Sequence, residues 1–265
     1  MKHIIVGSGV VGQATGKWLL ANKEEVLFND INEKIVEQLN KEGYNATSHI
    51  EKVDPKEYSI IWICTAEWNT EKALSKVAKF QDEKLGNLII YVIRSTTLPG
   101  TTKELKEKYK IRFIAHNPEF LRASTAIEDM FNPDRIIIGT DCHFVYSTLY
   151  SIYKTTHAPI VNVDFTSSEV IKLASNCWLA TQISYWNEIK KICEKFNLNP
   201  QAVANACTLD KRISKYGSKM VGTPYSGFCL PKDMETFSNL FKEKDLHSEF
   251  LHLVSRTNKD ERKKD

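Results

Sequence analysis

The chain has 265 residues, 42% of them hydrophobic and 26% charged, the composition of a soluble globular protein with room for one large domain or two of ordinary size. A net charge of +3 is too small to indicate binding to nucleic acid or to an anionic membrane. The six cysteines form no CxxC pair, so no metal site is expected, and free thiols in a reducing compartment are the simplest account. No signal-peptide pattern follows Met1 and no apolar run exceeds strand length, so we expect a cytoplasmic protein.

Strand-like and helix-like segments alternate through the first part of the chain. Short, unbroken runs rich in Ile and Val predict strands buried on both faces of a parallel sheet. These runs are His3–Val6, Val26–Asn29, Ile60–Cys64, Leu88–Ile93, Arg112–Ala115, Arg135–Ile138 and Ile160–Val163. The helical patterns between them are Val10–Ala21, Glu33–Lys41, Thr70–Phe80, Thr102–Tyr109 and Phe144–Lys154. The alternation predicts an α/β domain over residues 1–164, a Rossmann-type doubly wound parallel sheet.

Beyond that point the strand signal disappears. Thr166-Ser-Ser-Glu169 has the pattern of a capping box, which predicts a helix start, and helical periodicity without Pro or Gly continues to about Phe196. A second helix is predicted to start at Asn199 and a third at Thr236. Residues 165–265 are therefore expected to form an all-helical domain with one long central helix.

Gly7-Ser-Gly-Val-Val-Gly12 follows the first strand and opens a helix. Gly7 permits a tight turn, Gly9 lets the backbone approach a pyrophosphate, and Gly12 lets helix and strand pack closely. The helix amino end adds N–H donors and a favourable dipole. Asp30 closes the second strand, where a carboxylate can accept from ribose hydroxyls and repels a 2′-phosphate, so NAD is favoured over NADP. The alternative is a glycine turn with a solvated aspartate.

Polar residues on the long helix and after two strands are candidates for chemistry. Lys172 and Asn176 share a helix face, where an ammonium and an amide can stabilise an oxyanion, although an isolated pair is more often a surface contact. Glu119, after a strand, can position a water or act as a base, or make only local turn hydrogen bonds. Ser95 and Thr96 can hold a water or a ribose, or cap the turn that follows.

Cys229 lies in Ser226-Gly-Phe-Cys-Leu-Pro-Lys-Asp233, within what is otherwise an alcohol dehydrogenase pattern. Hydride transfer between an alcohol and a ketone needs no nucleophile, whereas a thiol can capture an aldehyde for a second oxidation. We expect a loop here, in which Gly227 bends the backbone close to a ligand and Pro231 fixes the exit. Lys232 would favour the thiolate, although a lone cysteine is more often buried and inert.

Together these segments resemble the UDP-glucose/GDP-mannose dehydrogenase family. The matching segments follow the family's order over nearly the whole chain, which is far more specific than any single motif. They are Gly7–Gly12, Arg94-Ser-Thr with Pro99-Gly-Thr-Thr, Asn117-Pro-Glu-Phe-Leu-Arg122, Pro133–Gly139, Glu169-x-x-Lys172-x-x-x-Asn176, Arg212-Ile213 and Cys229-x-Pro-Lys-Asp233.

The resemblance implies NAD-dependent, four-electron oxidation of the 6-hydroxyl of a nucleotide sugar to a carboxylate, with UDP-glucose or GDP-mannose as substrate type. Cys229 would carry a thiohemiacetal and then a thioester. Lys172 and Asn176 would stabilise the oxyanions. Asp233 with Thr96 would hold a water, and Glu119 would assist hydrolysis of the thioester.

The resemblance also implies binding residues and a partner. The residues implied to bind NAD are Gly7, Gly9, Val10, Val11, Gly12, Asp30, Thr65, Ser95 and Lys232. Those implied to bind the nucleotide sugar are Phe120, Leu121, Arg122, Arg212 and Gly227. The 166–196 helix would form the core of a homodimer, and Arg212 would match an arginine that in some members reaches the partner's substrate.

The sequence departs from the family pattern at three places. Ala123 stands where many members have a second glutamate, and Tyr225, Ser226 and Phe228 replace a glycine-rich approach to the cysteine. Family members also continue beyond the position of Asp265 into a further nucleotide-binding domain. Two alternatives stay open: a two-electron β-hydroxyacid dehydrogenase of the same two-domain architecture, and a truncated NAD-binding homologue without turnover.

Overall fold

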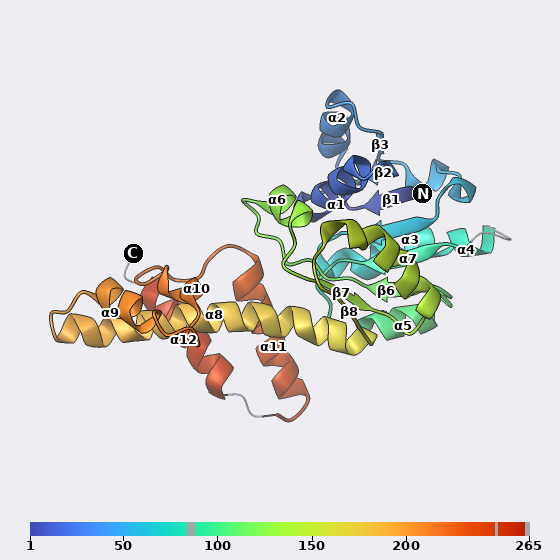
Figure 1. Cartoon of the computed structure of the whole chain (residues 1–265). Helices are drawn as coiled ribbons and strands as arrows, with labels where there is room; N and C mark the ends of the chain where they lie inside the picture. The colour runs from blue at the N-terminus through green and yellow to red at the C-terminus, as the bar shows by residue number, and fades with distance from the viewer. Residues whose placement is uncertain (84–87, 247–248, 263–265) are drawn as a thin grey trace. The chain divides into compact units, whose positions relative to one another are not determined.

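The computed structural model describes residues 1–83, 88–246 and 249–262, and the chain divides into two compact units, Met1–Lys172 and Leu173–Asp265 (Figure 1). The predicted domain boundary, between residues 164 and 165, falls where helix α8 (Phe165–Lys195) begins, whereas the units divide inside this helix.

Unit 1 contains one sheet of eight strands in the order β3-β2-β1-β4-β5-β6-β7-β8. The strands are β1 (Lys2–Val6), β2 (Glu25–Asn29), β3 (Ala46–Thr47), β4 (Ile60–Ile63), β5 (Ile90–Ile93), β6 (Ile114–His116), β7 (Ile136–Gly139) and β8 (Ile160–Val163). All neighbours pair in parallel except β6 and β7, which are antiparallel. The chain winds outward from β1 in both directions, so the predicted doubly wound fold is confirmed.

Helices cover both faces of this sheet (Figure 1). They are α1 (Val10–Ala21), α2 (Glu33–Lys41), α3 (Thr70–Ala78), α4 (Phe80–Glu83), α5 (Thr101–Lys108), α6 (Ala126–Phe131) and α7 (His143–Tyr153), with short 3₁₀ turns at η1 (Ile50–Lys52), η2 (Pro55–Glu57), η3 (Glu67–Asn69) and η4 (Lys154–Thr156). Alternate strand residues point to opposite sides: Ile5 packs with α1, α6 and α7, whereas Ile4 packs with α3 and α5. The interior strands are buried along their whole length, which explains their unbroken runs of Ile and Val.

The start of α8 differs from the predicted capping box. The helix begins at Phe165, and its cap is Asp164, whose carboxylate accepts from the backbone N–H of Ser167 at 2.9 Å and from its hydroxyl at 2.5 Å. Glu169 does not turn back to Thr166, because other donors engage its carboxylate. The prediction of a capping box was therefore wrong, although the position of the helix start was close.

Unit 2 consists of the remainder of α8 followed by α9 (Pro200–Cys207), α10 (Lys215–Ser218), α11 (Cys229–Glu243) and α12 (Glu249–Arg262). Its core joins α8 to α11 and α12 through side chains that include Ile183, Met234 and Val254. The helix predicted from Thr236 in fact begins at Cys229. Pro231 lies in its first turn, where a missing N–H costs nothing because that group has no helical partner.

Among the described residues, none of the helices combines the length and the apolar character needed to cross a bilayer. Nor do three His, Cys, Asp or Glu side chains gather there as metal ligands would.

Candidate active site

The turn between β1 and α1 is a candidate phosphate site. Gly7 has a φ of +90°, and a Cβ at residue 12 would overlap the Gly7 carbonyl oxygen, so both positions need glycine. Gly9 is exposed, and nothing lies within 4 Å of a Cβ built on it. Val10 and Val11 open α1, whose amino end carries no side-chain cap. An uncapped helix amino end with open backbone in front of it fits a pyrophosphate.

Asp30 follows β2 and supports this turn from the side. Its carboxylate accepts from the backbone N–H of Ser8 at 2.7 Å and from that of Asn32 at 2.9 Å, one bond to each oxygen. Each carboxylate oxygen can accept a second donor, and the residue is partly exposed, so ribose hydroxyls can be accommodated. The arrangement fits the predicted role of Asp30 in binding NAD.

The ends of β4 and β5 bring Thr65 and Ser95 together. Ser95 is buried and its hydroxyl donates to the Thr65 carbonyl oxygen at 2.7 Å. The Thr65 hydroxyl is itself buried without a hydrogen-bond partner in the part of the chain that the structure describes. Buried polar atoms rarely stay unsatisfied, so a polar group of a bound dinucleotide fits at this edge of the sheet.

Glu119 and Lys172 form a buried ion pair within unit 1. The Lys172 ammonium donates to the Glu119 backbone oxygen at 2.6 Å and to its Oε1 at 2.8 Å. The second carboxylate oxygen accepts from the Leu121 N–H at 2.6 Å, and the Phe120 ring centre lies 5.4 Å from the ammonium. The side chains of lysine and glutamate are 4% and 12% exposed. A lysine on α8 and a glutamate after β6, far apart in sequence, are thus brought into direct contact.

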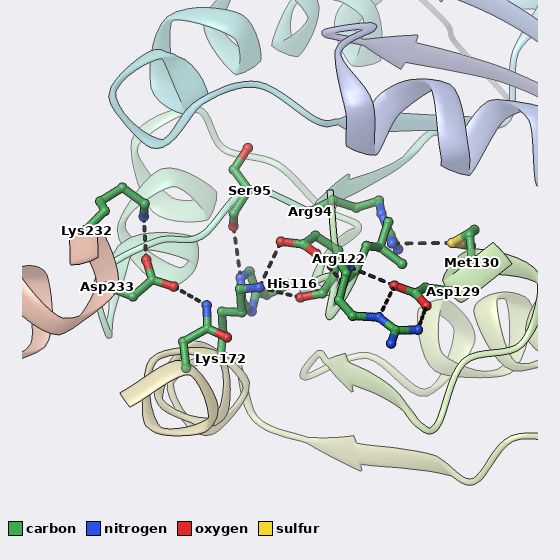
Figure 2. Close-up of polar contacts among 12 residues, drawn as sticks. Arg94, Ser95, His116, Arg122, Asp129, Met130, Lys172, Lys232 and Asp233 are labelled. Carbon is green, nitrogen blue, oxygen red and sulfur yellow. Dashed lines mark hydrogen bonds and ion pairs between the residues drawn. The ribbon is translucent and has the colours of Figure 1, made fainter. Parts of the chain in front are cut away.

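Arg94 and Asn117 fix the turn that carries Glu119. The guanidinium of Arg94 is buried and donates from one nitrogen to Asn117 Oδ1 at 2.5 Å and to the Tyr153 hydroxyl at 2.8 Å. Its other terminal nitrogen approaches the Met130 sulfur at 3.7 Å (Figure 2). The Asn117 amide in turn donates to the Ile137 carbonyl oxygen at 2.7 Å. This network ties β5, β6 and β7 together at the base of the turn.

His116 is a buried neighbour of these groups. Its Nδ1 lies 2.8 Å from the Ser168 hydroxyl and its Nε2 lies 3.3 Å from the Ser95 carbonyl oxygen. Burial lowers the pKa of His116 to about 3, so the ring is neutral at physiological pH. A neutral ring can accept at Nδ1 and donate from Nε2, which suits a structural link between α8 and the end of β5.

Asp233 organises the polar groups of unit 2. It is fully buried, and its Oδ2 accepts from the Asn176 amide at 2.5 Å. Its Oδ1 lies 2.5 Å from the Lys232 ammonium (Figure 2). That contact is an ion pair, and Oδ1 has no hydrogen-bond donor among the described residues. An oxygen of this kind can still orient a water molecule.

Cys229 is exposed and is the first residue of α11. The expected loop ends at Phe228, and the thiol lies at the amino end of the helix, where the helix dipole stabilises a negative charge. Lys232 and Asp233 follow at three and four residues, so the three side chains share one helix face. Gly227, just before the helix, has a φ of +74° and open space around it.

Three further predicted site residues are Arg122, Arg212 and Thr96. Arg122 folds back on Asp129, with Nη2 at 2.5 Å from Oδ1, and its guanidinium lowers the pKa of Asp129 to about 2 (Figure 2). Arg212 is exposed and pairs with Asp210 at 2.6 Å. Thr96 is partly exposed, and its hydroxyl has no partner within residues 1–83, 88–246 and 249–262.

Comparisons with known proteins match both units. The family described as "UDP-glucose/GDP-mannose dehydrogenase family, NAD binding domain" matches residues 63–157, and the central domain of the same family matches residues 166–260. The UDP-glucose 6-dehydrogenase of Streptococcus pneumoniae is 31% identical over 296 residues, which cover 98% of this chain and 73% of that protein.

The chain belongs to the UDP-glucose/GDP-mannose dehydrogenase family.

Two further relatives give the extent of the likeness. The UDP-glucose 6-dehydrogenase YwqF of Bacillus subtilis is 39% identical over 177 residues, covering 64% of this chain and 40% of that protein. A solved UDP-glucose dehydrogenase from Pyrobaculum islandicum superposes with a TM-score of 0.89 at 26% identity, covering 97% of this chain and 68% of the other. The chain thus spans between 40% and 73% of the lengths of these relatives. Family membership makes NAD its cofactor, and the geometry of unit 1 fits that group.

Two residues in the site region escaped the sequence reasoning as functional candidates. Arg94 belongs to a family motif, and Glu169 belongs to a family motif and to the predicted capping box, yet both are buried and bond to segments next to predicted site residues. A charged residue at the end of an apolar strand was the available signal for Arg94. For Glu169 no local signal existed, because its partners lie about seventy positions earlier in the chain.

Proposed function

We propose that this chain catalyses the NAD-dependent, four-electron oxidation of the 6-hydroxyl of a nucleotide sugar, of the UDP-glucose or GDP-mannose type, through a thioester on Cys229. The observation that carries the proposal is the position of Cys229 at the start of α11, with Asp233 one turn later bonded to Asn176. The activity named for the relatives, UDP-glucose 6-dehydrogenase, supports the reaction class.

Lys172 and Asn176 are the proposed oxyanion donors. The lysine ammonium has three N–H bonds and the described contacts use two, both with Glu119. The Asn176 amide has two N–H bonds and uses one, with Asp233. Each group therefore keeps one donor for a substrate oxygen, and each is already held in place by a carboxylate. Donors fixed before the reaction stabilise developing negative charge without reorganisation.

The thiol carries the second half of the reaction. When bound, NAD supplies the acceptor for each hydride that leaves carbon 6 of the sugar. The Cys229 thiolate adds to the aldehyde carbon, forming a C–S bond and an oxyanion that accepts from Lys172 and Asn176. After the second oxidation the carbon is a thioester. Water then attacks it, the C–S bond breaks, the thiolate leaves, and the proton of the water passes to a carboxylate, for which we propose Glu119.

We propose most of the NAD-binding residues in unit 1. The helix amino end at Gly9, Val10 and Val11 would hold the pyrophosphate, and Asp30 the ribose. Thr65, Ser95 and Lys232 stay proposals on the family resemblance, and so do Phe120, Leu121, Arg122, Arg212 and Gly227 for the nucleotide sugar. We also propose a reducing compartment, the cytoplasm. No disulfide joins the six cysteines, which lie in the described residues, and this supports the use of Cys229 as a thiol.

The yield of NADH per mole of substrate tests the proposed reaction. Two NADH per nucleotide sugar are expected across a panel of UDP-glucose, GDP-mannose and UDP-N-acetyl sugars, and the sugar that reacts identifies the substrate. One NADH per substrate with a hydroxyacid would instead favour the two-electron dehydrogenase. Binding of NAD by calorimetry, without NADH formation from any of these compounds, would favour a homologue without turnover.

Cys229→Ser should let the first oxidation begin and should abolish formation of the uronic acid, because a serine hydroxyl is a much weaker nucleophile toward the aldehyde than a thiolate. Cys207→Ser is the matched control, since Cys207 is also exposed but is the last residue of α9, not the first residue of α11. Product analysis by mass spectrometry separates the two. Normal uronate formation by Cys229→Ser would rule out the thioester.

We further propose a homodimer formed through α8. Large apolar side chains stand exposed on one face of this helix and directly after it, at Trp178, Tyr185, Ile192 and Phe196. The first three repeat at intervals of seven, which keeps them on a single stripe. Exposed apolar stripes of this kind are typical of protein interfaces, and a second copy of the same helix would cover this one.

A further inference from the structure

Glu169 is a carboxylate that none of the proposed chemical steps uses. It lies in the second turn of α8 and is fully buried. Four donors converge on it: the Thr97 hydroxyl at 3.2 Å, the Gly100 N–H at 2.6 Å, and the N–H and hydroxyl of Thr102 at 2.8 and 2.6 Å. In the described part of the chain no cation pairs with it. Burying a carboxylate costs folding free energy, even when hydrogen bonds satisfy it. A carboxylate kept at such a position is therefore a candidate for a functional role.

The donors all belong to the segment 97–102, which joins β5 to α5. Gly100 is the residue before α5 and has a φ of +102°, and Thr102 lies in the first turn of that helix. Glu169 therefore caps α5 from another helix, where a negative charge also meets the positive end of the helix dipole. Burial raises the pKa of Glu169, and the hydrogen bonds from Thr102, Gly100 and Thr97 oppose that rise.

The same stretch of α8 also reaches the loop after β6. Ser168, beside Glu169, bonds His116, the last residue of β6. Lys172, one turn after Glu169, bonds Glu119. The first two turns of α8 therefore bond to two loops. One is the loop that follows Ser95 and Thr96, and the other is the loop that carries Glu119.

We propose that Glu169 is a positioning residue, which sets Lys172 against Glu119 by anchoring α8 to the 97–102 segment. The inference rests on the proposed function in that it takes Lys172 as the oxyanion donor. Lys172 lies only one turn after Glu169 on the same helix. If Glu169 shifts relative to the 97–102 segment, the Lys172 ammonium should therefore shift by a similar distance. A misplacement of roughly 1 Å at a catalytic group can cost on the order of 100-fold in rate.

Glu169→Gln is the first test, because it keeps the size of the side chain and presents an amide donor to groups that are already donors. The single-turnover rate of NADH formation should fall about tenfold or more, with a smaller change in KM for the nucleotide sugar. Glu104→Gln is the matched control: it removes an exposed carboxylate from the same first turn of α5 and should leave the rate unchanged. A normal rate for Glu169→Gln would overturn the inference.

A double-mutant cycle with Lys172→Met separates positioning from a general effect on the fold. If Glu169 acts through Lys172, adding Glu169→Gln to Lys172→Met should cause no further loss of rate. If the fold-losses in rate of the two single variants multiply in the double variant, Glu169 acts independently of Lys172. That outcome would overturn the inference.

A readout without turnover separates this inference from the proposed function. Acylation of lysines, followed by mass spectrometry, should label Lys172 several-fold faster in Glu169→Gln, while Lys106 changes little. Unchanged labelling of Lys172 overturns the inference, whether or not any nucleotide sugar is oxidised. Faster labelling without oxidation of any nucleotide sugar by the wild type would support the anchor and reject the proposed function.

If Glu169→Gln does not fold, Thr102→Val offers a milder change. It removes one of the four hydrogen bonds and keeps the carboxylate, and Thr102→Ser is its match because it keeps the hydroxyl. Lys172 should be acylated faster in Thr102→Val than in the wild type, and at the wild-type rate in Thr102→Ser. Equal labelling in the two would contradict the anchor.

Discussion

Gly9 and Gly12 lie in one turn, yet an added methyl group would meet different surroundings at each. At Gly12 it would overlap the backbone of Gly7, which cannot move without distorting β1, so Gly12→Ala should lower the free energy of unfolding by about 3 kcal/mol. At Gly9 the methyl group meets nothing within 4 Å and φ is −73°, so Gly9→Ala should cost less than about 1 kcal/mol.

The two variants should also differ in how they affect the cofactor. The methyl group of Gly9→Ala would project toward the proposed pyrophosphate site, so NAD binding should weaken roughly tenfold, about 1.4 kcal/mol, in an intact fold. Urea unfolding measures the stability of both variants and calorimetry measures NAD affinity. Equal losses of stability, or unchanged NAD affinity in Gly9→Ala, would contradict the roles given to these glycines.

At the scale of one element, the role of Asp164 as the cap of α8 predicts how substitutions change stability. Asp164→Ala removes the acceptor of the Ser167 N–H and should lower the free energy of unfolding by about 1 kcal/mol. Thr166→Ala tests the capping box that the sequence suggested and should have little effect, since Thr166 is not the cap. Thermal or urea unfolding measures both. A larger loss for Thr166→Ala than for Asp164→Ala would restore the capping box.

Strands and helices could be predicted where the signal was local. Buried strands such as β4 and β5 are runs of β-branched residues, and their existence follows from that alone. The direction of β7 could not be predicted, because a short apolar run looks the same in a parallel and an antiparallel pair. The start of α11 was missed because Pro231 suggested a loop, although proline is well tolerated in a first turn. β3, with two residues, is too short to leave a pattern.

The candidate site could be predicted only in part, for a similar reason. Cys229, Lys172, Asn176 and Asp233 lie in recognisable motifs, and the structure brings Asn176 to Asp233 within unit 2. The contacts of Glu169 join residues about seventy positions apart, and no pattern within one segment encodes such a distance. Residues that take part in chemistry can be recognised from motifs in the sequence. The residues that hold them in place can be identified only once the fold is known.

At the scale of the whole molecule, the stripe on α8 predicts the state of association. Sedimentation equilibrium should give a dimer for the wild type and a monomer for Ile192→Glu, because a charge within an apolar interface stays desolvated and unpaired. Ile127→Glu is the matched control, since Ile127 is exposed to a similar degree on α6 in unit 1. A dimer that survives Ile192→Glu would exclude this face of α8 as the interface.

The ends of the sheet also limit how the protein can aggregate. Strand edges offer unpaired N–H and C=O groups to other chains, and long flat edges promote fibre growth. One edge of this sheet is β3, whose two residues offer too few groups to template another strand. The other edge is β8, which is four residues long. Asp164 and α8 come directly after β8, so the strand cannot extend further. The residue that starts the long helix therefore also keeps the exposed border of the sheet short.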